Sequence, residues 1–208
     1  MGASEHPSDD DLIAGIAAGD REAFAVLYRR RRPDVYRFAL HVSGSPQVAD
    51  DVSQDVFMAV INHAARYRSG RSGVVPWLLG IARNHVRRWV ARERPAVSLA
   101  NDDETGAART PALPPPAVDI DTDPLASLTR RRNVAALRRA VLALPVTYRE
   151  AVVLCDLQEL SYASAATALG CAIGTVRSRL HRGRALLAKR LRGTDEAAFR
   201  NAAARWIL

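Results

Sequence analysis

The sequence is poor in cysteine, and its cysteines do not form a metal-binding or redox pattern. Cys155 and Cys171 are too far apart for a CxxC pair, and no cluster of histidines accompanies them. We interpret them as two reduced thiols that pack as small apolar side chains. The sequence also has no glycine-rich phosphate loop and no nucleophile grouped with a base. We therefore expect no metal, no cofactor and no enzymatic activity.

Long apolar runs are also missing. No stretch approaches the roughly 18 apolar residues that cross a bilayer, and the opening MGASEHPSDDD is acidic where a signal peptide would be basic. These absences predict a soluble, cytoplasmic protein that does not bind a membrane. Aromatic residues make up only 6% of the chain, whereas apolar residues make up 48%. The core is therefore expected to consist largely of Ala, Val and Leu.

Positive charge is in excess and is unevenly distributed. The chain of 208 residues carries a net charge of +8. Residues 1–94 contribute +3 and residues 95–126 contribute −5, whereas residues 127–192 carry 13 Lys and Arg against 3 Asp and Glu, a net charge of +10. A solvated surface would mix in more acids. A basic segment of this density is typical of a surface that binds a polyanion, and we expect nucleic acid.

A segment of different composition separates two helical regions. Residues 94–124 are rich in Pro, Ala and Asp and have no apolar periodicity, so they cannot bury enough surface to offset the entropy of ordering. On either side, apolar residues recur with helical spacing. We predict an all-α protein with two small helical domains joined by a flexible linker. The predicted parts are a first domain at 1–94, the linker at 95–126, a helix-turn-helix domain at 127–192 and a C-terminal tail at 193–208.

In the first domain, one expected helix has two different faces. The segment VADDVSQDVFMAVINHAARYR places Val52 and Val56 on an apolar stripe and acidic side chains on the other side. After the loop RSGRSGVV, Pro76 is well placed in the first turn of a further helix, PWLLGIARNHVRRWVARER. Trp77 and Trp89 fall on the apolar half of that helix, so we favour core packing over base stacking for both.

The second domain contains the pattern of a helix-turn-helix. Thr147 and Glu150 in TYRE match a capping box at the start of a helix. Ser161 is expected to cap the next short helix, YASAATAL, and Gly170 to close it in a left-handed conformation. The segment that follows, GTVRSRLHRGRALLAKRL, has an apolar stripe that includes Val176 and a basic opposite face. Two helices related in this way cross steeply, and the second offers its N-terminal polar residues to the major groove of DNA.

These segments together resemble a known family. LPVTYREAVVLCDLQELSYASAATALGCAIGTVRSRLHRGRALLAKRL resembles the promoter-binding C-terminal domain of bacterial sigma factors of the extracytoplasmic-function (ECF) group of the sigma-70 family. VADDVSQDVF followed by PWLLGIARNHVRRW is similar to the core-polymerase and promoter-melting parts of the same group's N-terminal domain. The resemblance implies an RNA polymerase sigma factor that directs promoter recognition, DNA melting and transcription initiation.

The resemblance also implies partners and a surface for one of them. The implied partners are core RNA polymerase, through its largest and second-largest subunits, promoter DNA and an anti-sigma factor. An acidic helical surface would contact a basic coiled coil on the largest subunit, because opposite charges steer such an encounter. A merely solvated acidic face is the alternative. The residues of this surface are Asp50, Asp51, Gln54 and Asp55.

For DNA, the resemblance implies two further surfaces. One recognises the minus-ten element, where the family flips a base into a loop pocket, and the other reads the minus-thirty-five element. Arg177 and Arg179 are the expected base readers, because arginine pairs bidentately with guanine, whereas Arg182, Arg184 and Lys189 are expected to anchor phosphates. The minus-ten residues are Ser69, Gly70, Arg71, Arg83, Asn84, Arg87 and Arg88. The minus-thirty-five residues are Thr175, Arg177, Ser178, Arg179, His181 and Arg182.

A stand-alone helix-turn-helix regulator is the alternative function. Such a protein would use only the basic C-terminal domain and would bind its operator tightly without polymerase. It leaves unexplained both the acidic helix of the first domain and the second basic helix that follows it. The C-terminal tail lies outside the resemblance. It either docks on one of the domains through its apolar residues or is a frayed end, and we favour docking.

Overall fold

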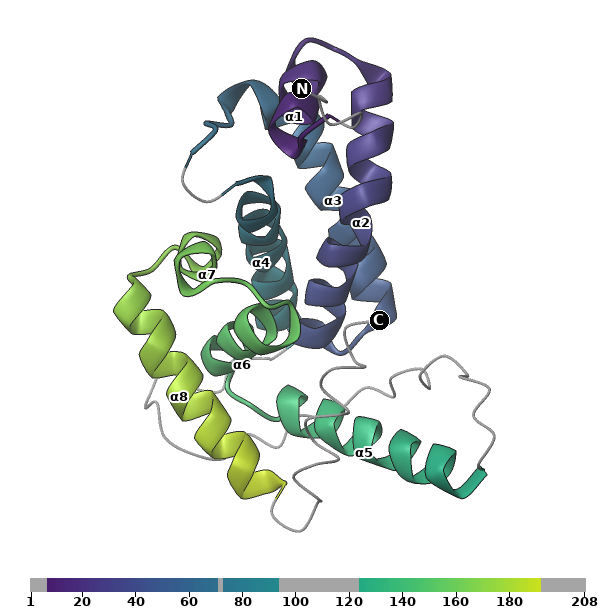
Figure 1. Ribbon diagram of the computed structural model, residues 1–208, viewed down its shortest axis with the longest axis vertical. Coiled ribbons are helices and arrows are strands. Elements are labelled where there is room, and N and C mark those ends of the chain that lie inside the picture. Colours follow the sequence, from purple (N-terminus) through teal and green to yellow (C-terminus); the bar gives the residue numbers. More distant parts are fainter. Residues whose placement is uncertain (1–6, 71–72, 94–123, 192–208) are drawn as a thin grey trace, which may run out of the picture.

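All the regular elements of the structure are helical (Figure 1). The computed structural model describes residues 7–70, 73–93 and 124–191, and within these ranges there is no strand. The predicted all-α fold is therefore confirmed, whereas most of the predicted linker, Arg71 and the whole of the tail lie outside the described residues. None of the described helices is long and apolar enough to span a membrane.

The first domain is a bundle built around one long helix, α2, which contacts the other three helices (Figure 1). Asp20 caps α2, because its Oδ1 accepts hydrogen bonds from the backbone N–H groups of Glu22 and Ala23 at 2.8 and 3.2 Å. Trp77 and Trp89 are partly buried and pack against the core, so the interpretation as packing residues is confirmed. The elements are α1 Asp9–Ala17, α2 Arg21–Ser43, α3 Pro46–His63, the 3-10 helix η1 Ala64–Arg66 and α4 Val74–Glu93.

The second domain contains the predicted helix-turn-helix. The hydroxyl of Ser161 accepts a hydrogen bond from the backbone N–H of Ser164 at 3.1 Å, and Gly170 closes the helix at φ +58°. Both expectations are therefore confirmed. The apolar side of the last helix, including Val176 and Leu180, is buried. The elements are α5 Pro124–Leu142, α6 Val146–Val152, the π-helix η2 Val153–Leu157, α7 Tyr162–Leu169 and α8 Ile173–Arg190.

The predicted capping box at Thr147–Glu150 is wrong. Pro145 is the N-cap residue of α6, and no side chain caps this helix. The side chain of Glu150 is completely buried and pairs with Arg83 and Arg87 of α4. A local cap leaves the carboxylate in water near the helix end, whereas two guanidinium groups in a buried site offer stronger, charge-assisted hydrogen bonds.

The two domains pack directly against each other. Helix α7 packs against α4, and the end of α2 lies beside α5 and α6 (Figure 1). A Cβ atom added at Gly80 of α4 would lie 3.5 Å from the carbonyl oxygen of Ala168 in α7. One added at Gly44, which ends α2, would lie 2.9 Å from a methyl group of Leu142. The buried apolar residues of both domains therefore form one continuous cluster.

Acidification is expected to destabilise the fold through His41. Burial, and then the nearby cations Arg138 and Arg37, lower the pKa of His41 from 6.5 to about 3. Below pH 6.5 the unfolded chain therefore binds a proton that the folded chain does not bind. The contribution of His41 to stability is complete above pH 6.5 and is lost as the pH falls toward 3, by about 1.4 kcal/mol per pH unit.

Urea unfolding of the wild-type and His41→Phe chains at pH 7 and pH 5 measures this contribution. We expect the free energy of unfolding to fall more steeply with acidification in the wild type. The carboxylates common to both chains serve as the internal control. An equal fall in the two chains would show that His41 is not held neutral.

Replacement of Gly183 is expected to disturb the packing of α8 on α6. A Cβ atom at Gly183 would lie 2.8 Å from Cγ2 of Val152 and 3.4 Å from the carbonyl oxygen of Tyr148. Gly183→Ala should therefore lower the free energy of unfolding by about 1–3 kcal/mol, as overpacking does. Gly174→Ala is the matched control in the same helix, because nothing lies within 4 Å of its added Cβ. Equal urea midpoints for the two variants would contradict this account.

Candidate functional site

An acid-rimmed groove lies between α2 and α3. Its volume is about 280 Å³. Its floor is aromatic, because the ring of Tyr28 packs edge-on against the ring of Phe57, with centroids 4.8 Å apart. Met58 is 53% exposed beside this floor. The lining residues are Phe24, Tyr28 and Arg32 from α2 and Asp50, Asp51, Gln54, Phe57 and Met58 from α3.

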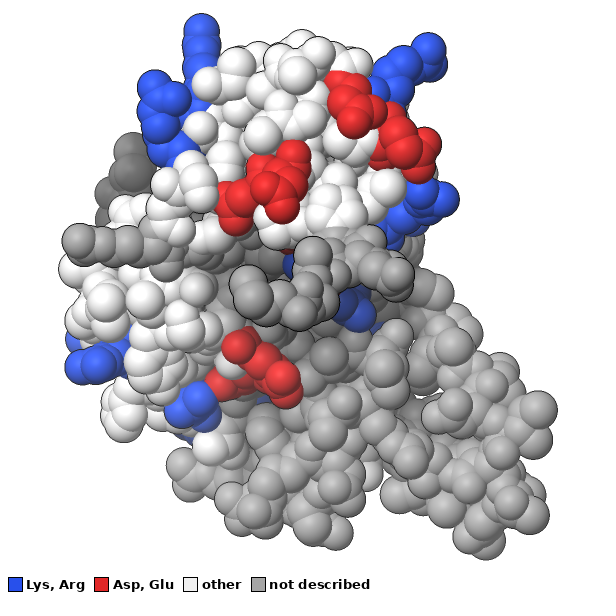
Figure 2. Space-filling model, turned by 45° about the horizontal axis from the view of Figure 1, so that its top comes forward, with Lys and Arg blue, Asp and Glu red and all other residues white. Residues whose placement is uncertain are grey.

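The structure brings three of the four predicted acidic-surface residues together at this groove. Asp50 is paired with Arg32 across the rim at 2.9 Å, and Asp51 and Gln54 are exposed. Asp55 does not line the groove; its carboxylate is 3.0 Å from Nδ1 of His85 on α4. On the face drawn in Figure 2, acidic side chains form separate small groups rather than one continuous field.

The aromatic floor of the groove was not predicted from the sequence. Phe24 and Tyr28 belong to α2, and only the packing of α2 on α3 places them beside the acidic residues. One signal was available, because Met58 is a large apolar residue on the otherwise polar face of the α3 segment. An exposed apolar side chain among acids indicates a contact surface better than a solvated face does.

The predicted minus-ten residues on α4 are divided between two environments. Asn84 and Arg88 are exposed. Arg83 and Arg87 instead point toward the second domain, where Glu150 accepts hydrogen bonds from Arg83 Nε at 3.0 Å and from Arg87 Nε and Nη2 at 2.6 and 2.8 Å. Ser69 and Gly70 lie in an exposed loop before α4, and Arg71 lies outside the described residues. The structure therefore does not gather this set on one open surface.

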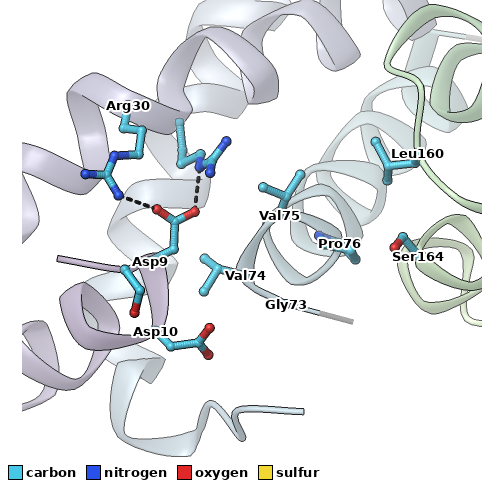
Figure 3. Close-up of a pocket in the computed structure, with 11 residues that line it drawn as sticks. Asp9, Asp10, Arg30, Gly73, Val74, Val75, Pro76, Leu160 and Ser164 are labelled. Atoms are coloured by element: carbon cyan, nitrogen blue, oxygen red, sulfur yellow. Dashed lines mark hydrogen bonds and ion pairs between the residues drawn. The ribbon is translucent and has the colours of Figure 1, made fainter. Parts of the chain in front are cut away.

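A second hollow lies between the two domains near the start of α4 (Figure 3). Its volume is about 520 Å³. Asp9 on one wall is paired with Arg30 and Arg31 at 2.8 and 2.6 Å. Leu160 and Ser164 of the second domain form the opposite wall. None of the described minus-ten residues lines this hollow.

The exposed face of α8 carries most of the predicted minus-thirty-five residues. Arg177, Ser178, His181 and Arg182 are exposed, and the Arg177 guanidinium lies 5.8 Å from the ring centroid of Tyr162. Arg179 is only half-exposed, and its Nη1 is buried without a hydrogen-bond partner. It is therefore less accessible to a base than Arg177.

Two of the other predicted DNA contacts on α8 are engaged within the domain. Arg184 donates to both carboxylate oxygens of Asp156 at 3.1 and 2.5 Å, and this hydrogen bonding raises the pKa of its guanidinium. Thr175 is half-buried, and its carbonyl oxygen accepts a hydrogen bond from the hydroxyl of Ser178 at 3.0 Å. Arg184 is therefore less available as a phosphate anchor than the sequence pattern suggests.

Comparison with known families matches both halves of the chain. The family model described as Sigma-70 region 2 matches residues 27–95, and the model described as Sigma-70, region 4 matches residues 135–187. The first match contains α4 and every lining residue of the acid-rimmed groove except Phe24, and the second contains the helix-turn-helix. Because the N-terminal half is matched as well, nothing favours a stand-alone helix-turn-helix regulator.

Individual proteins of the same family also match this chain over most of its length. The chain is 35% identical over 192 residues to the ECF RNA polymerase sigma factor SigM of Mycobacterium tuberculosis, covering 92% of this chain and 88% of SigM. It is 34% identical over 186 residues to the ECF RNA polymerase sigma factor SigE of Mycolicibacterium smegmatis, covering 86% of this chain and 67% of SigE.

The fold is also similar to two solved structures. One is CnrH in complex with the cytosolic domain of CnrY, with a TM-score of 0.64, 24% identity and coverage of 91% of this chain and all of CnrH. The other is the sigma factor RpoE in complex with the anti-sigma factor NepR from Bartonella quintana, with a TM-score of 0.54, 22% identity and coverage of 79% and 93%. Two regions matched in order, and relatives that match over most of their length, place this chain in the ECF group of RNA polymerase sigma factors.

Proposed function

We propose that this sigma factor binds core RNA polymerase through the acid-rimmed groove between α2 and α3. The observation that carries the proposal is the combination of an aromatic floor and the exposed side chain of Met58 with an acidic rim. A basic coiled coil on the largest subunit has complementary chemistry, because its cations pair with the acidic rim and apolar side chains on its outer surface cover the floor. Asp50, Asp51 and Gln54 form the rim, and Asp55 extends the acidic surface toward α4.

The two helical surfaces of α4 and α8 bind promoter DNA in this proposal. Asn84 and Arg88, with Arg83, Arg87 and the loop at 69–71, contact the opened minus-ten element. The exposed side chains of α8 enter the major groove at the minus-thirty-five element, and Arg177 is the favoured base reader because it is more accessible than Arg179. The second-largest polymerase subunit is a further proposed contact of the C-terminal domain. The protein supplies positioning, and the polymerase supplies the chemistry.

An anti-sigma factor is a further proposed partner. RpoE of Bartonella quintana, which has a similar fold, was solved in complex with the anti-sigma factor NepR. A protein that covered the acid-rimmed groove would compete with core polymerase for the same floor. This competition is the simplest physical route to inhibition.

Reversal of one charge on the groove rim tests the polymerase surface. Asp51→Lys should weaken binding to core polymerase at least tenfold, which is about 1.4 kcal/mol, because it sets like charges against each other. Glu22→Lys is the matched control, because Glu22 is a highly exposed acid of α2 that does not line the groove. Fluorescence anisotropy of the labelled chain with core polymerase measures both. Equal affinities for the two variants would eliminate this groove as the docking site.

Removal of one arginine tests the reading of the minus-thirty-five element. Arg177→Ala should reduce discrimination between a matched and a mutated element by about 1–3 kcal/mol, the value of one bidentate base contact. Lys189→Ala, also on the exposed side of α8, should weaken binding to all sequences uniformly and reduce its salt dependence. Transcription by the reconstituted holoenzyme from two promoters, one with the matched and one with the mutated element, gives the ratio of activities that measures this discrimination. An unchanged ratio in the Arg177 variant would place base reading elsewhere.

A further inference from the structure

We propose that the two domains hold each other in a self-inhibited closed state, in which Glu150 retains the α4 arginines that promoter DNA requires. This inference rests on the proposed function of α4. It needs no second protein, because the chain itself supplies the anion that occupies its DNA-binding cations. Promoter phosphates and Glu150 then compete for the same guanidinium groups.

The first support is the pairing at Glu150. Its side chain has no exposed surface, and its two oxygens accept three hydrogen bonds from Arg83 and Arg87. The Arg87 contact is bidentate, which is the geometry that the same side chain uses with a phosphate. The Arg83 side chain is only 16% exposed. The Arg87 side chain is 35% exposed, but the two donors of its bidentate edge are occupied by Glu150. Both arginines are therefore engaged within the protein while the domains are in contact.

The residue before Glu150 makes a second contact between the domains. The guanidinium of Arg149 donates to the carbonyl oxygen of Val42 at the C-terminal end of α2 and to the carbonyl oxygens of Leu142 and Leu144 in its own domain. A buried cation at a helix C-terminus is favoured by the helix dipole. Gln158 adds a hydrogen bond from its Nε2 to the carbonyl oxygen of Asp34 at 2.9 Å.

The closed arrangement is too compact to reach both promoter elements. Helix α8 packs on α7 and α7 packs on α4 (Figure 1), so α8 lies roughly two helix layers, or about 20 Å, from α4. Elements named for positions 35 and 10 lie about 25 base pairs apart, which is roughly 85 Å of duplex. The thirty residues at 94–123 span at most about 100 Å when extended. The chain is therefore long enough to reach both elements, but only after the domains separate.

A bulky substitution at the contact between α4 and α7 tests the closed state without altering Glu150, Arg83 or Arg87. Gly80→Trp places a large side chain where an added Cβ already lies 3.5 Å from the Ala168 carbonyl oxygen, whereas Gly80→Ala requires only an ordinary van der Waals contact. We expect the tryptophan variant of the full chain to have a larger radius of gyration in small-angle X-ray scattering. The alanine variant should match the compact wild type. Circular dichroism confirms that each variant retains its helix content.

Separation of the two domains should also release Arg83 and Arg87 from Glu150. Binding to fluorescein-labelled oligothymidylate at low salt should tighten about tenfold in the Gly80→Trp chain if the open form is a tenth of the wild-type population. Glu150→Gln changes no residue of α4 or α7 and removes the negative charge that pairs with Arg83 and Arg87. It should also tighten the binding of oligothymidylate. An equal radius and an equal affinity in the wild type and both variants would overturn the self-inhibited state.

Arg83→Ala with Arg87→Ala in the Gly80→Trp background separates the two proposals. If these substitutions weaken oligothymidylate binding but Gly80→Trp alone does not strengthen it, the DNA role of α4 stands and self-inhibition fails. If Gly80→Trp opens the chain and the arginine substitutions change nothing, the DNA role of α4 fails and the inhibition proposal fails with it. Tightening by Gly80→Trp that is abolished by the arginine substitutions supports both.

Discussion

The buried carboxylate of Glu150 is the constraint on which the observed arrangement depends. An ionised carboxylate without exposed surface is tolerable only when cations and hydrogen-bond donors surround it, and α4 supplies two guanidinium groups at 2.6–3.0 Å. The pairing links residues 67 and 63 positions apart in the chain. It fixes how α6 faces α4, and the contacts of α7 with α4 and of Arg149 with α2 follow from that orientation.

The same pairing connects the fold to the function. A sigma factor needs separate surfaces for polymerase and for two promoter elements, and the proposed function assigns these to the α2–α3 groove, to α4 and to α8. The acid-rimmed groove stays open while the domains are in contact, because its lining residues come from α2 and α3 alone. The α4 surface is half-covered. Under the proposed function, the polymerase-binding groove is therefore open in the closed state, whereas the DNA-binding surface of α4 becomes complete only when the domains separate.

Several features followed directly from local sequence. The Asp20 cap, the Ser161 cap and the left-handed Gly170 were predictable because each is set by residues within three or four positions. The helical periodicity predicted the buried stripes of α3 and α8 in the same way. The capping box at Thr147–Glu150 satisfied the same local rule and was wrong, because the pattern cannot register a distant cation that competes for the carboxylate.

By itself, the sequence determined the helical class, the helix-turn-helix, the acidic face of α3 and the basic face of α8, since periodicity, capping and composition act over short distances. Tertiary structure alone decided which charged groups are free to act. The packing of α2 on α3 places Phe24 and Tyr28 beside the acidic residues of α3. Asp55 pairs with His85, and one nitrogen of the Arg179 guanidinium is buried. Arg83 and Arg87 pair with Glu150 of the other domain. Each of these outcomes depends on side chains that meet only when separate helices pack, and a charge is worth most where packing excludes water.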